Sequence, residues 1–371
     1  MKIVFVSATG AKESGLLAIV NQFIKNIPHG EELFYYVFVD PFYRIQLEQT
    51  NIKYVRINTR SQLKRIFWDS YGLKKWSQKN SIKPDLIVSL QNTSINYSEE
   101  IPQIVYYHQL LPLVPYHWNI WNKDELKLYV FARTYPFFVK RYFNSNTYVV
   151  VQLPSTRNLF LKKFNVDEKK VTAIIPTVII NGTDCSNQLD WNQNEIHFIY
   201  PATFFPYKNH ILLVKAMTLL RGRMKNGFDK IKIHLTLDDN KCMKLVKAII
   251  RCNLHDTFVF EKTVEYNRLQ SMYKQSHALL FPSQIESLGL PLIEAARAGI
   301  KVIANNRPFV LDAIGQYKGL TIVGEDAGEW ADAIQACVLN GREIYTPYNY
   351  MSDDYDGWRS FFDLLVKIIN K

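Results

Sequence analysis

The sequence predicts an α/β protein with two doubly wound domains, each a parallel sheet covered by helices. Short apolar runs alternate with segments of helical period along the chain, which is the order typical of parallel sheets. At 371 residues the chain is longer than most single domains. A polar, turn-rich stretch at residues 181–195 separates two parts that both show this alternation. We therefore expect domains at 1–180 and 196–355 joined by a linker.

The first part alternates from its first residues onward. Its expected strands are residues 2–7, 34–39, 85–90, 103–109, 148–153 and 171–176, and its clearest helices are 16–27 and 155–164. Residues 56–79 and 129–143 combine aromatic side chains with lysine and arginine. Two interpretations stay open for these stretches. They are either ordinary helices with aromatic side chains in the core or helices that rest on the headgroup layer of an anionic membrane.

The second part repeats the pattern. Its expected strands are residues 196–200, 232–237, 257–260, 278–281, 301–304 and 319–323, and its expected helices include 211–220, 241–251, 267–274 and 329–339. Pro282 ends one of these strands, Pro291 suits the first turn of a further helix, and Gly299 suits the position just after that helix. A last apolar helix is expected at 358–369.

The strongest functional signal lies between Pro282 and Gly299. The backbone N–H groups near the helix start would favour an anion, because they lack helical partners and lie at the positive end of the helix dipole. These groups belong to Ser287, Leu288, Gly289 and Leu290. Glu286 and Glu294 lie on either side. A carboxylate repels phosphate but accepts strong hydrogen bonds from hydroxyl groups. Phosphate flanked by hydroxyls describes a sugar nucleotide, and the alternative of two solvated surface carboxylates would not need these prolines and glycines.

This segment resembles the Glu-x7-Glu motif of retaining glycosyltransferases of family 4, with Phe-Pro-Ser before it and Gly-Leu-Pro-Leu-Ile-Glu-Ala-Ala within and after it. The resemblance implies the GT-B fold, in which two Rossmann-like domains face a central cleft and a C-terminal helix, here 356–371, crosses back to the first domain. It implies that Glu286 contacts the donor sugar and Glu294 the ribose. The wording Pro-Tyr-Lys-Asn-His at 206–210 is similar to bacterial mannosyl-type members that build polysaccharide or lipopolysaccharide.

Lys208 stands at an expected helix start behind a strand, a suitable place for a cation on a diphosphate. The family pattern here reads Gly-Arg-x4-Lys, whereas this chain has Ala202 and Thr203 before Lys208. A threonine cannot supply the planar fork of an arginine. Diphosphate binding is therefore expected to depend on Lys208, the helix-start N–H groups and Thr203.

His108 ends the expected strand 103–109, and ligands of such sheets bind beyond the carboxyl ends of the strands. It resembles the family's histidine near the donor sugar, although a lone histidine is more often structural. Gly10 and Gly15 lie in the first strand-to-helix loop, which in the resembled family faces the acceptor. The alternative is a plain turn. Their spacing is not that of a dinucleotide-binding loop.

The net charge of +11 calls for an anionic partner such as nucleic acid, an anionic membrane surface or phosphorylated substrates. No nucleic-acid recognition signature is present, so no such partner is expected. The sequence has no run of about 18 apolar residues and no signal-peptide pattern. Four scattered cysteines, Cys185, Cys242, Cys252 and Cys337, have no metal-ligand spacing. We expect reduced thiols in a cytoplasmic protein that lies at the inner membrane face if the membrane interpretation holds.

The adjacent acids Asp238 and Asp239 are a weak metal signal, and the family resemblance implies a metal-free mechanism without cofactors. The resulting hypothesis is a retaining enzyme that moves a hexose from a nucleoside-diphosphate sugar to a saccharide or lipid-linked acceptor. Lys208, Glu286 and His108 are its expected catalytic residues. Two rivals stay open: another GT-B enzyme, such as a sugar-nucleotide epimerase or hydrolase, and a non-catalytic basic module that binds membrane or nucleic acid.

Overall fold

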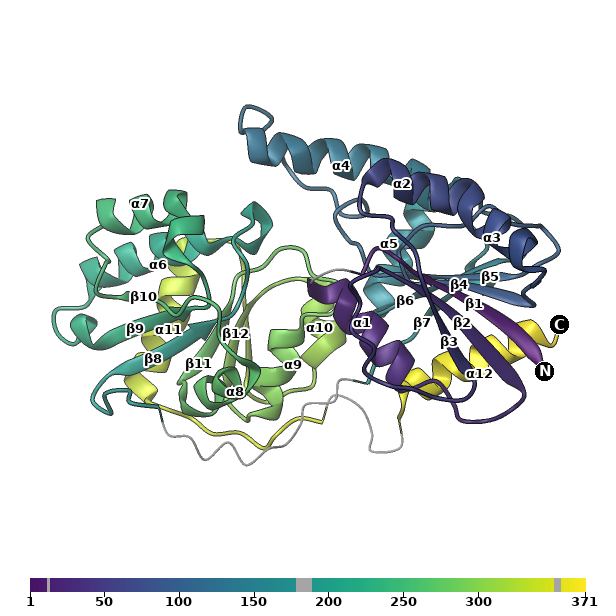
Figure 1. Ribbon diagram of the computed structural model, residues 1–371. Coiled ribbons are helices and arrows are strands. Elements are labelled where there is room, and N and C mark those ends of the chain that lie inside the picture. Colours follow the sequence, from purple (N-terminus) through teal and green to yellow (C-terminus); the bar gives the residue numbers. More distant parts are fainter. Residues whose placement is uncertain (12–13, 178–188, 350–354) are drawn as a thin grey trace. The chain divides into compact units, whose positions relative to one another are not determined.

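The computed structural model of the chain describes residues 1–11, 14–177, 189–349 and 355–371 (Figure 1). Contacts group the chain into two compact units. Unit 1 comprises residues 1–177 and 356–371, and unit 2 comprises residues 178–355. The first part of the expected linker, residues 181–188, lies outside the described residues, as does Cys185. The linker therefore stays a prediction.

Unit 1 is built on a seven-stranded parallel sheet of order β3-β2-β1-β4-β5-β6-β7. Its strands are β1 (Lys2–Ala8), β2 (Leu33–Val39), β3 (Ile52–Arg56), β4 (Leu86–Ser89), β5 (Gln103–Tyr107), β6 (Thr147–Val151) and β7 (Val171–Ala173). Its helices are α1 (Ser14–Lys25), α2 (Gln62–Phe67), the π-helical η1 (Trp68–Gly72), α3 (Leu73–Asn80), α4 (Lys123–Lys140), α5 (Pro154–Phe164), the short η2 (Glu168–Lys170) and α12 (Gly357–Ile369).

Unit 2 is built on a six-stranded parallel sheet of order β10-β9-β8-β11-β12-β13. Its strands are β8 (Ile196–Tyr200), β9 (Ile231–Leu235), β10 (Phe258–Phe260), β11 (Ala278–Phe281), β12 (Lys301–Asn305) and β13 (Leu320–Val323). Its helices are α6 (His210–Arg223), α7 (Met243–Arg251), α8 (Tyr266–Gln275), α9 (Leu290–Arg297), α10 (Pro308–Ile314) and α11 (Ala327–Asn340), with short turns η3 (Pro206–Lys208), η4 (Phe228–Lys230) and η5 (Asp239–Lys241).

Both sheets are doubly wound, which confirms the predicted fold class. In each sheet the strand order changes direction beside the first strand of the unit, between β1 and β4 and between β8 and β11. Loops that leave the carboxyl ends of such a pair of strands diverge to opposite faces of the sheet, which opens a crevice for ligands. The candidate residues after β8 and β11 therefore lie at the switch point of unit 2.

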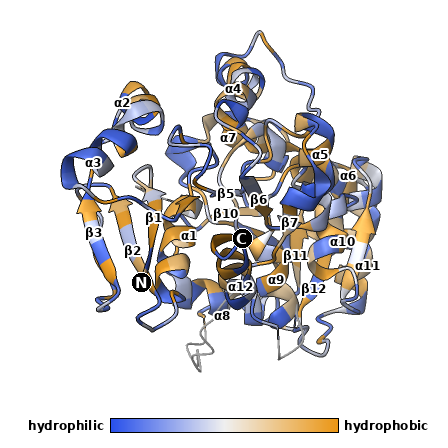
Figure 2. Cartoon of the chain, turned by 90° about the vertical axis from the view of Figure 1, so that its right-hand side faces the viewer, coloured by the Kyte–Doolittle hydropathy of each residue, from blue (hydrophilic) through white to orange (hydrophobic). Residues whose placement is uncertain are grey.

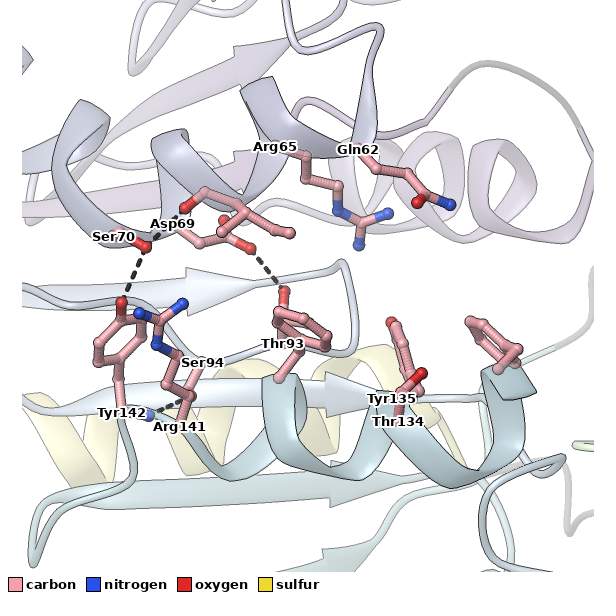
Figure 3. A pocket seen from close by; sticks show the side chains of 13 residues that line it. Gln62, Arg65, Asp69, Ser70, Thr93, Ser94, Thr134, Tyr135, Arg141 and Tyr142 are labelled. Atoms are coloured by element: carbon pink, nitrogen blue, oxygen red, sulfur yellow. Dashed lines mark hydrogen bonds between the residues drawn. The ribbon is translucent and has the colours of Figure 1, made fainter. Parts of the chain in front are cut away.

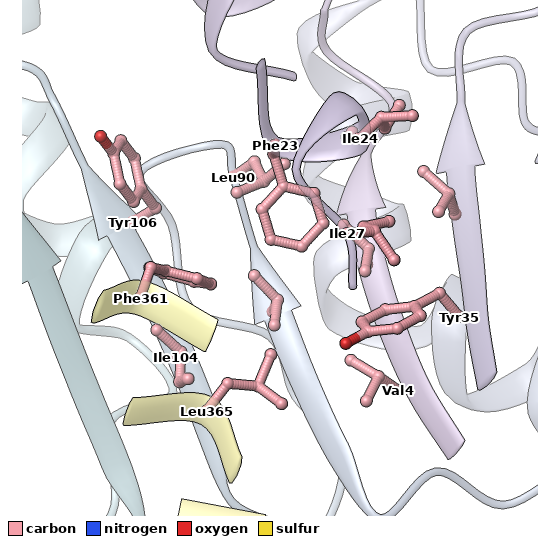
Figure 4. Close-up of a cluster of buried hydrophobic side chains, with 14 of the residues drawn as sticks. Val4, Phe23, Ile24, Ile27, Tyr35, Leu90, Ile104, Tyr106, Phe361 and Leu365 are labelled. Atoms are coloured by element: carbon pink, nitrogen blue, oxygen red, sulfur yellow. The ribbon is translucent and has the colours of Figure 1, made fainter. Parts of the chain in front are cut away.

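The C-terminal helix α12 packs in unit 1, as the family resemblance implied. Phe361 is fully buried, with its ring 5.7 Å from that of Phe23 on α1 and 6.0 Å from that of Tyr106 on β5. Figure 4 shows Phe361 and Leu365 of α12 among the side chains of the sheet and of α1. The Lys2 Nζ donates a hydrogen bond of 2.7 Å to the Ile369 carbonyl. The two ends of the chain thus share one hydrophobic core.

The aromatic side chains of the basic stretch 56–79 are partly buried and partly exposed, so its contact with a membrane stays a prediction. Trp68 is 5% exposed and packs against Phe38 in the core, whereas Phe67 and Tyr71 are 53% and 57% exposed. Figure 2 shows hydrophobic and hydrophilic residues mixed along α2 and along α4. The edge strand β3 is absent from the sequence prediction because Lys53 and Arg56 interrupt its apolar pattern.

Replacing Phe361 by alanine is expected to lower the free energy of unfolding of unit 1 by about 3–5 kcal/mol, because the lost ring leaves a cavity in the core. Chemical denaturation measures this loss. Val366→Ala on the same helix is a matched control, since Val366 is 39% exposed and should cost less than about 1 kcal/mol. Equal losses in both variants would contradict the placement of α12 in this core.

Candidate functional site

The candidate site of unit 2 is centred on an ion pair between the Lys208 Nζ and the Glu286 carboxylate. Both side chains are mostly buried, at 15% and 14% exposure. Lys208 ends η3, which follows β8, and Glu286 lies between β11 and α9. Since β8 and β11 are neighbours in the sheet, folding joins two residues that are 78 positions apart in the sequence.

A hydrogen bond from a buried side chain at the end of β8 fixes the backbone at Lys208. The buried Tyr200 hydroxyl, at the end of β8, donates a hydrogen bond of 2.7 Å to the carbonyl oxygen of Lys208. His210 begins α6, and its ring lies 4.7 Å from that of Tyr200. Burial, together with the nearby Lys208 charge, lowers the pKa of His210 to about 3, so this ring is neutral and packs as a core side chain. Thr203, the residue in place of the family arginine, lies exposed in the loop between β8 and η3.

The loop before α9 follows the sequence prediction. Gly289 has φ +74°, and a Cβ on it would lie 2.9 Å from the Leu292 Cδ1, so the loop requires glycine there. Pro291 lies in the first turn of α9, and Gly299 follows the helix with φ +72°. The first N–H groups of the helix have no intrahelical acceptor and lie at its positive end. The predicted donor-binding segment 287–290 therefore lies where an anion is favoured.

Glu294 lies within α9 and accepts a hydrogen bond of 2.8 Å from the Tyr273 hydroxyl on α8. Burial raises the pKa of Glu294 to about 7, although the bond from Tyr273 opposes this rise. Burial likewise raises the pKa of Tyr273, which therefore stays a donor. Tyr273 uses the Oε2 of Glu294, so the Oε1 can accept hydrogen bonds from hydroxyl groups of a ligand.

A second polar group at the same edge of the sheet was not predicted from the sequence. The Gln284 Nε2 donates a hydrogen bond of 2.6 Å to the Glu325 Oε1, and Arg307 forms an ion pair with the same carboxylate. The backbone N–H of Gln284 donates to the Tyr207 carbonyl at 2.8 Å, which joins the two loops of the central ion pair. These residues follow β11, β12 and β13. Polar residues after successive strands are the signal that could have identified them.

His108 follows β5 at the carboxyl edge of the unit 1 sheet, where the sequence placed it. Its backbone N–H donates a hydrogen bond of 2.6 Å to the Asn92 Oδ1, and its Nε2 lies 3.2 Å from the Asn92 Nδ2. Burial, together with the nearby Arg65 charge, lowers the pKa of His108 to about 4. The ring is therefore a neutral imidazole at pH 7 that can exchange hydrogen bonds without carrying charge.

Gly10 lies in the same region of unit 1. Its N–H donates a hydrogen bond of 2.7 Å to the Gln91 Oε1, and a Cβ there would lie 2.9 Å from that oxygen and 3.1 Å from the Arg65 Nη1. The absence of a side chain at Gly10 thus permits Gln91 and Arg65 to lie close to its backbone. The prediction that Gly15 lies in this loop is wrong. Helix α1 already begins at Ser14, and open space surrounds Gly15 in its first turn.

Within the described residues, no group of three or more His, Cys, Asp or Glu side chains is placed to hold a metal ion. Asp238 instead caps η5, where its side chain accepts a hydrogen bond from the Asn240 N–H. Cys242, Cys252 and Cys337 are free thiols. Among the helices in the described part of the chain, none has both the length and the apolar character needed to cross a bilayer.

Residues 183–350 match the protein family described as "Glycosyl transferases group 1". The O-antigen chain mannosyltransferase RfbU of Salmonella typhimurium is 25% identical over 181 residues, which are 49% of this chain and 48% of that protein. A D-inositol 3-phosphate glycosyltransferase of Arthrobacter sp. is 27% identical over 150 residues, which are 40% of this chain and 36% of that protein. The chain thus spans about half or less of the length of these relatives.

A solved glycosyltransferase structure from Rickettsia africae superimposes on the whole chain. The TM-score is 0.68 at 16% sequence identity, and the match covers 100% of this chain and 99% of the other. At this identity the likeness concerns the fold alone, and it extends over both units.

Because burial raises the pKa of Glu294 from 4.5 to about 7, the folded state binds a proton that the unfolded state releases between these values. Unit 2 should therefore lose stability, at most about 3 kcal/mol, as the pH rises through this range. Glu294→Gln removes this titration. Urea denaturation at several pH values should show wild type losing stability relative to the variant as the pH rises. A difference that does not vary with pH would contradict the assignment.

Proposed function

We propose that this chain, which has the GT-B fold and whose residues 183–350 match the family described as "Glycosyl transferases group 1", transfers a hexose from a nucleoside-diphosphate sugar to a saccharide or lipid-linked acceptor. The observation that carries the proposal is the buried pair of Lys208 and Glu286 beside the start of α9. A cation, N–H donors and a carboxylate in one place suit a diphosphate and the hydroxyls of its sugar. The printed name of one relative, a mannosyltransferase, agrees with hexose transfer.

The ion pair would exchange partners when the donor binds. Without a ligand, Lys208 and Glu286 neutralise each other, because a buried charge left alone is strongly destabilising. A diphosphate offers Lys208 a partner with more negative charge. Glu286 is then free to accept hydrogen bonds from hydroxyl groups of the donor sugar, which would orient the anomeric carbon.

In the transfer step, the bond between the anomeric carbon and the diphosphate oxygen breaks, and negative charge grows on the leaving group. Lys208 and the N–H groups at the start of α9 would stabilise that charge from fixed positions. One preorganised donor of this kind is worth about 3–4 kcal/mol in the transition state. The family resemblance implies retention, in which the departing diphosphate accepts the proton of the attacking hydroxyl on the same face. Such a step needs no separate base and no metal.

Three further residues would hold the substrates. Glu294 would accept hydrogen bonds from the ribose hydroxyls with its Oε1, since Tyr273 already occupies the Oε2. His108, a neutral imidazole at pH 7, would exchange hydrogen bonds with the transferred sugar. The close backbone packing at Gly10 would position the loop that the acceptor approaches.

The surface of α2 and α4 would rest on an anionic membrane at its cytoplasmic face. Exposed Leu63, Phe67 and Tyr71 are spaced four residues apart and so share one face. On α4, Phe137 is 64% exposed. The segments 62–80 and 126–142 contain one acid, the buried Asp69, among many lysines and arginines. Apolar side chains beside cations suit an anionic headgroup layer, and a lipid-linked acceptor would then be within reach.

Lys208→Ala and Glu286→Ala should each reduce sugar transfer to below about 1% of wild type at temperatures where the variants remain folded. Each should also lower the unfolding temperature, because the remaining charge is mostly buried and has lost its partner. The measurement is release of nucleoside diphosphate with a panel of nucleotide sugars, chosen by thermal shift, with and without acceptor. Lys215→Ala and Glu265→Ala are matched controls, since both side chains are exposed in unit 2. Near-normal rates in either site variant would contradict the assignment, and equal donor consumption without acceptor would favour a hydrolase.

The chain should float with vesicles that contain phosphatidylglycerol but not with pure phosphatidylcholine, and salt at about 0.5 M should release it by screening. Replacing Phe67 and Phe137 together by serine should reduce the floating fraction several-fold. Leu339→Ser is the control, because Leu339 is 74% exposed on α11 of unit 2. If the control loses as much as the double variant, the face is wrongly assigned.

A further inference from the structure

A pocket of about 220 Å³ lies within unit 1, between α2–η1 on one side and α4 on the other. Figure 3 shows Arg65 and Asp69 pointing from the α2 side toward α4, and Tyr135 pointing back from α4. Thr93, which follows β4, closes the interior. The pocket therefore combines charged and hydroxyl groups with aromatic walls. None of these groups is used by the donor site in unit 2.

Two guanidinium groups line the pocket. Arg65 donates a hydrogen bond of 2.6 Å from its Nη2 to the Gln91 carbonyl, which leaves other N–H donors of its five for a ligand. Arg141 lies over the Tyr142 and Phe137 rings, at 5.1 and 5.8 Å from their centres. Among the described residues, neither arginine has a carboxylate within ion-pair distance. A planar guanidinium is the side chain best suited to phosphate oxygens.

Asp69 supplies a buried group with unused hydrogen-bonding capacity. It is 7% exposed, and its Oδ2 accepts a hydrogen bond of 2.8 Å from Thr93, while its Oδ1 is buried without a partner. Buried polar atoms normally have partners, so an orphan in a pocket marks a place for a ligand atom. Burial raises the pKa of Asp69 to about 6, against the opposing effects of Arg65 and Thr93. Below that pH the neutral acid can donate a hydrogen bond to an anion.

The size and the rim of the pocket indicate that it holds part of a larger ligand. Pockets that enclose a whole small molecule measure about 300–1,000 Å³, and this one is smaller. The rim is taken as the exposed apolar side chains next to the lining residues Ile66 and Phe138, which are Phe67 on α2 and Phe137 on α4. The anionic end of a ligand would enter the pocket, and an apolar remainder would lie along the rim.

We propose that this pocket binds the phosphate of an amphiphile, with Arg65 and Arg141 on the phosphate oxygens and the hydrocarbon part along α2 and α4. The inference rests on the proposed function, because it names the lipid phosphate as the group that unit 1 recognises. Arg65 also lies beside Gly10, so a phosphate held here would be next to the loop assigned to the acceptor. The phosphate could belong to the lipid-linked acceptor or to a bilayer lipid.

Calorimetry on the full chain with soluble probes tests the site without any transfer reaction. The probes are farnesyl phosphate, which resembles an acceptor lipid, dihexanoyl phosphatidic acid, which resembles a bilayer lipid, and dihexanoyl phosphatidylcholine. Arg65→Gln and Arg141→Gln should each weaken binding of the phosphate monoesters by about tenfold or more. Lys64→Gln is the matched control, because this exposed cation on α2 lies outside the pocket lining. Tighter binding of the farnesyl probe assigns the site to the acceptor, and equal binding assigns it to bilayer lipid.

Asp69→Asn separates an anionic ligand from a neutral sugar. As the pH rises through about 6, wild-type binding of the phosphate probes should weaken relative to Asp69→Asn, because ionised Asp69 repels them. In the variant only the second ionisation of the phosphate remains, also near pH 6, and it should strengthen binding to the arginines. Loss of binding in Asp69→Asn, or binding of methyl mannoside that depends on Asp69, would overturn the proposal in favour of a saccharide.

The proposal also fails if both arginine variants bind like wild type, or if Lys64→Gln loses as much as they do. Thermal unfolding of each variant shows whether it is folded. If Arg65→Gln unfolds, Arg141→Gln still tests the site, because Arg141 is exposed and its replacement should not disturb folding. Nucleoside diphosphate binding, measured on the same samples, tests the donor site in unit 2 separately. Intact nucleotide binding with no lipid binding would therefore reject the pocket and leave the proposed function standing.

Discussion

The ion pair between Lys208 and Glu286 joins the loops that leave β8 and β11, the two strands at the switch point of unit 2. Both charges are mostly withdrawn from water, so each needs the other as long as no ligand is present. Each loop is also fixed on its own side, by Tyr200 under Lys208 and by the glycine geometry at Gly289. The pair therefore holds two loop segments at a distance suited to a ligand that carries both a diphosphate and hydroxyl groups. This arrangement is what connects the fold to the proposed chemistry.

Burial shifts the pKa of titratable groups in both units. Glu294 in unit 2 and His108 and Asp69 in unit 1 all have pKa values displaced toward their neutral forms by burial. Each side chain keeps a hydrogen-bonding partner that fixes its orientation, namely Tyr273, the Asn92 Nδ2 and Thr93. A folded chain retains buried ionisable groups at a cost in stability, and such groups gather where ligands bind. Their location agrees with a donor site in unit 2 and a separate ligand site in unit 1.

The sequence predicted most of the fold because each element had a local signal. Alternation of apolar runs with helical period located twelve of the strands, and the prolines and glycine around α9 located its ends. β3 was missed because an edge strand needs less apolar character than a central one, and its Lys53 and Arg56 hide it. Gly15 was predicted in a loop because the clear helical period starts only at Leu16, whereas α1 already begins at Ser14. In the aromatic stretches 56–79 and 129–143, the sequence could not show which aromatic side chains are buried. Aromatic residues occur all around these helices, so the pattern does not identify the face that packs on the sheet.

By itself the sequence determined the doubly wound architecture, the anion-favouring start of α9, and the identities of Lys208, Glu286, Glu294 and His108 as candidates. These follow from local rules of periodicity, turn geometry and charge. The tertiary structure alone decided which residues are partners: Glu286 with Lys208, Tyr273 with Glu294, and Gln284 and Arg307 with Glu325. It also decided that α2 and α4 enclose a pocket with an unpartnered Asp69 oxygen. The physical reason is that strand order sets which loops become neighbours, and burial sets which charges must find partners, and neither is encoded at any single position.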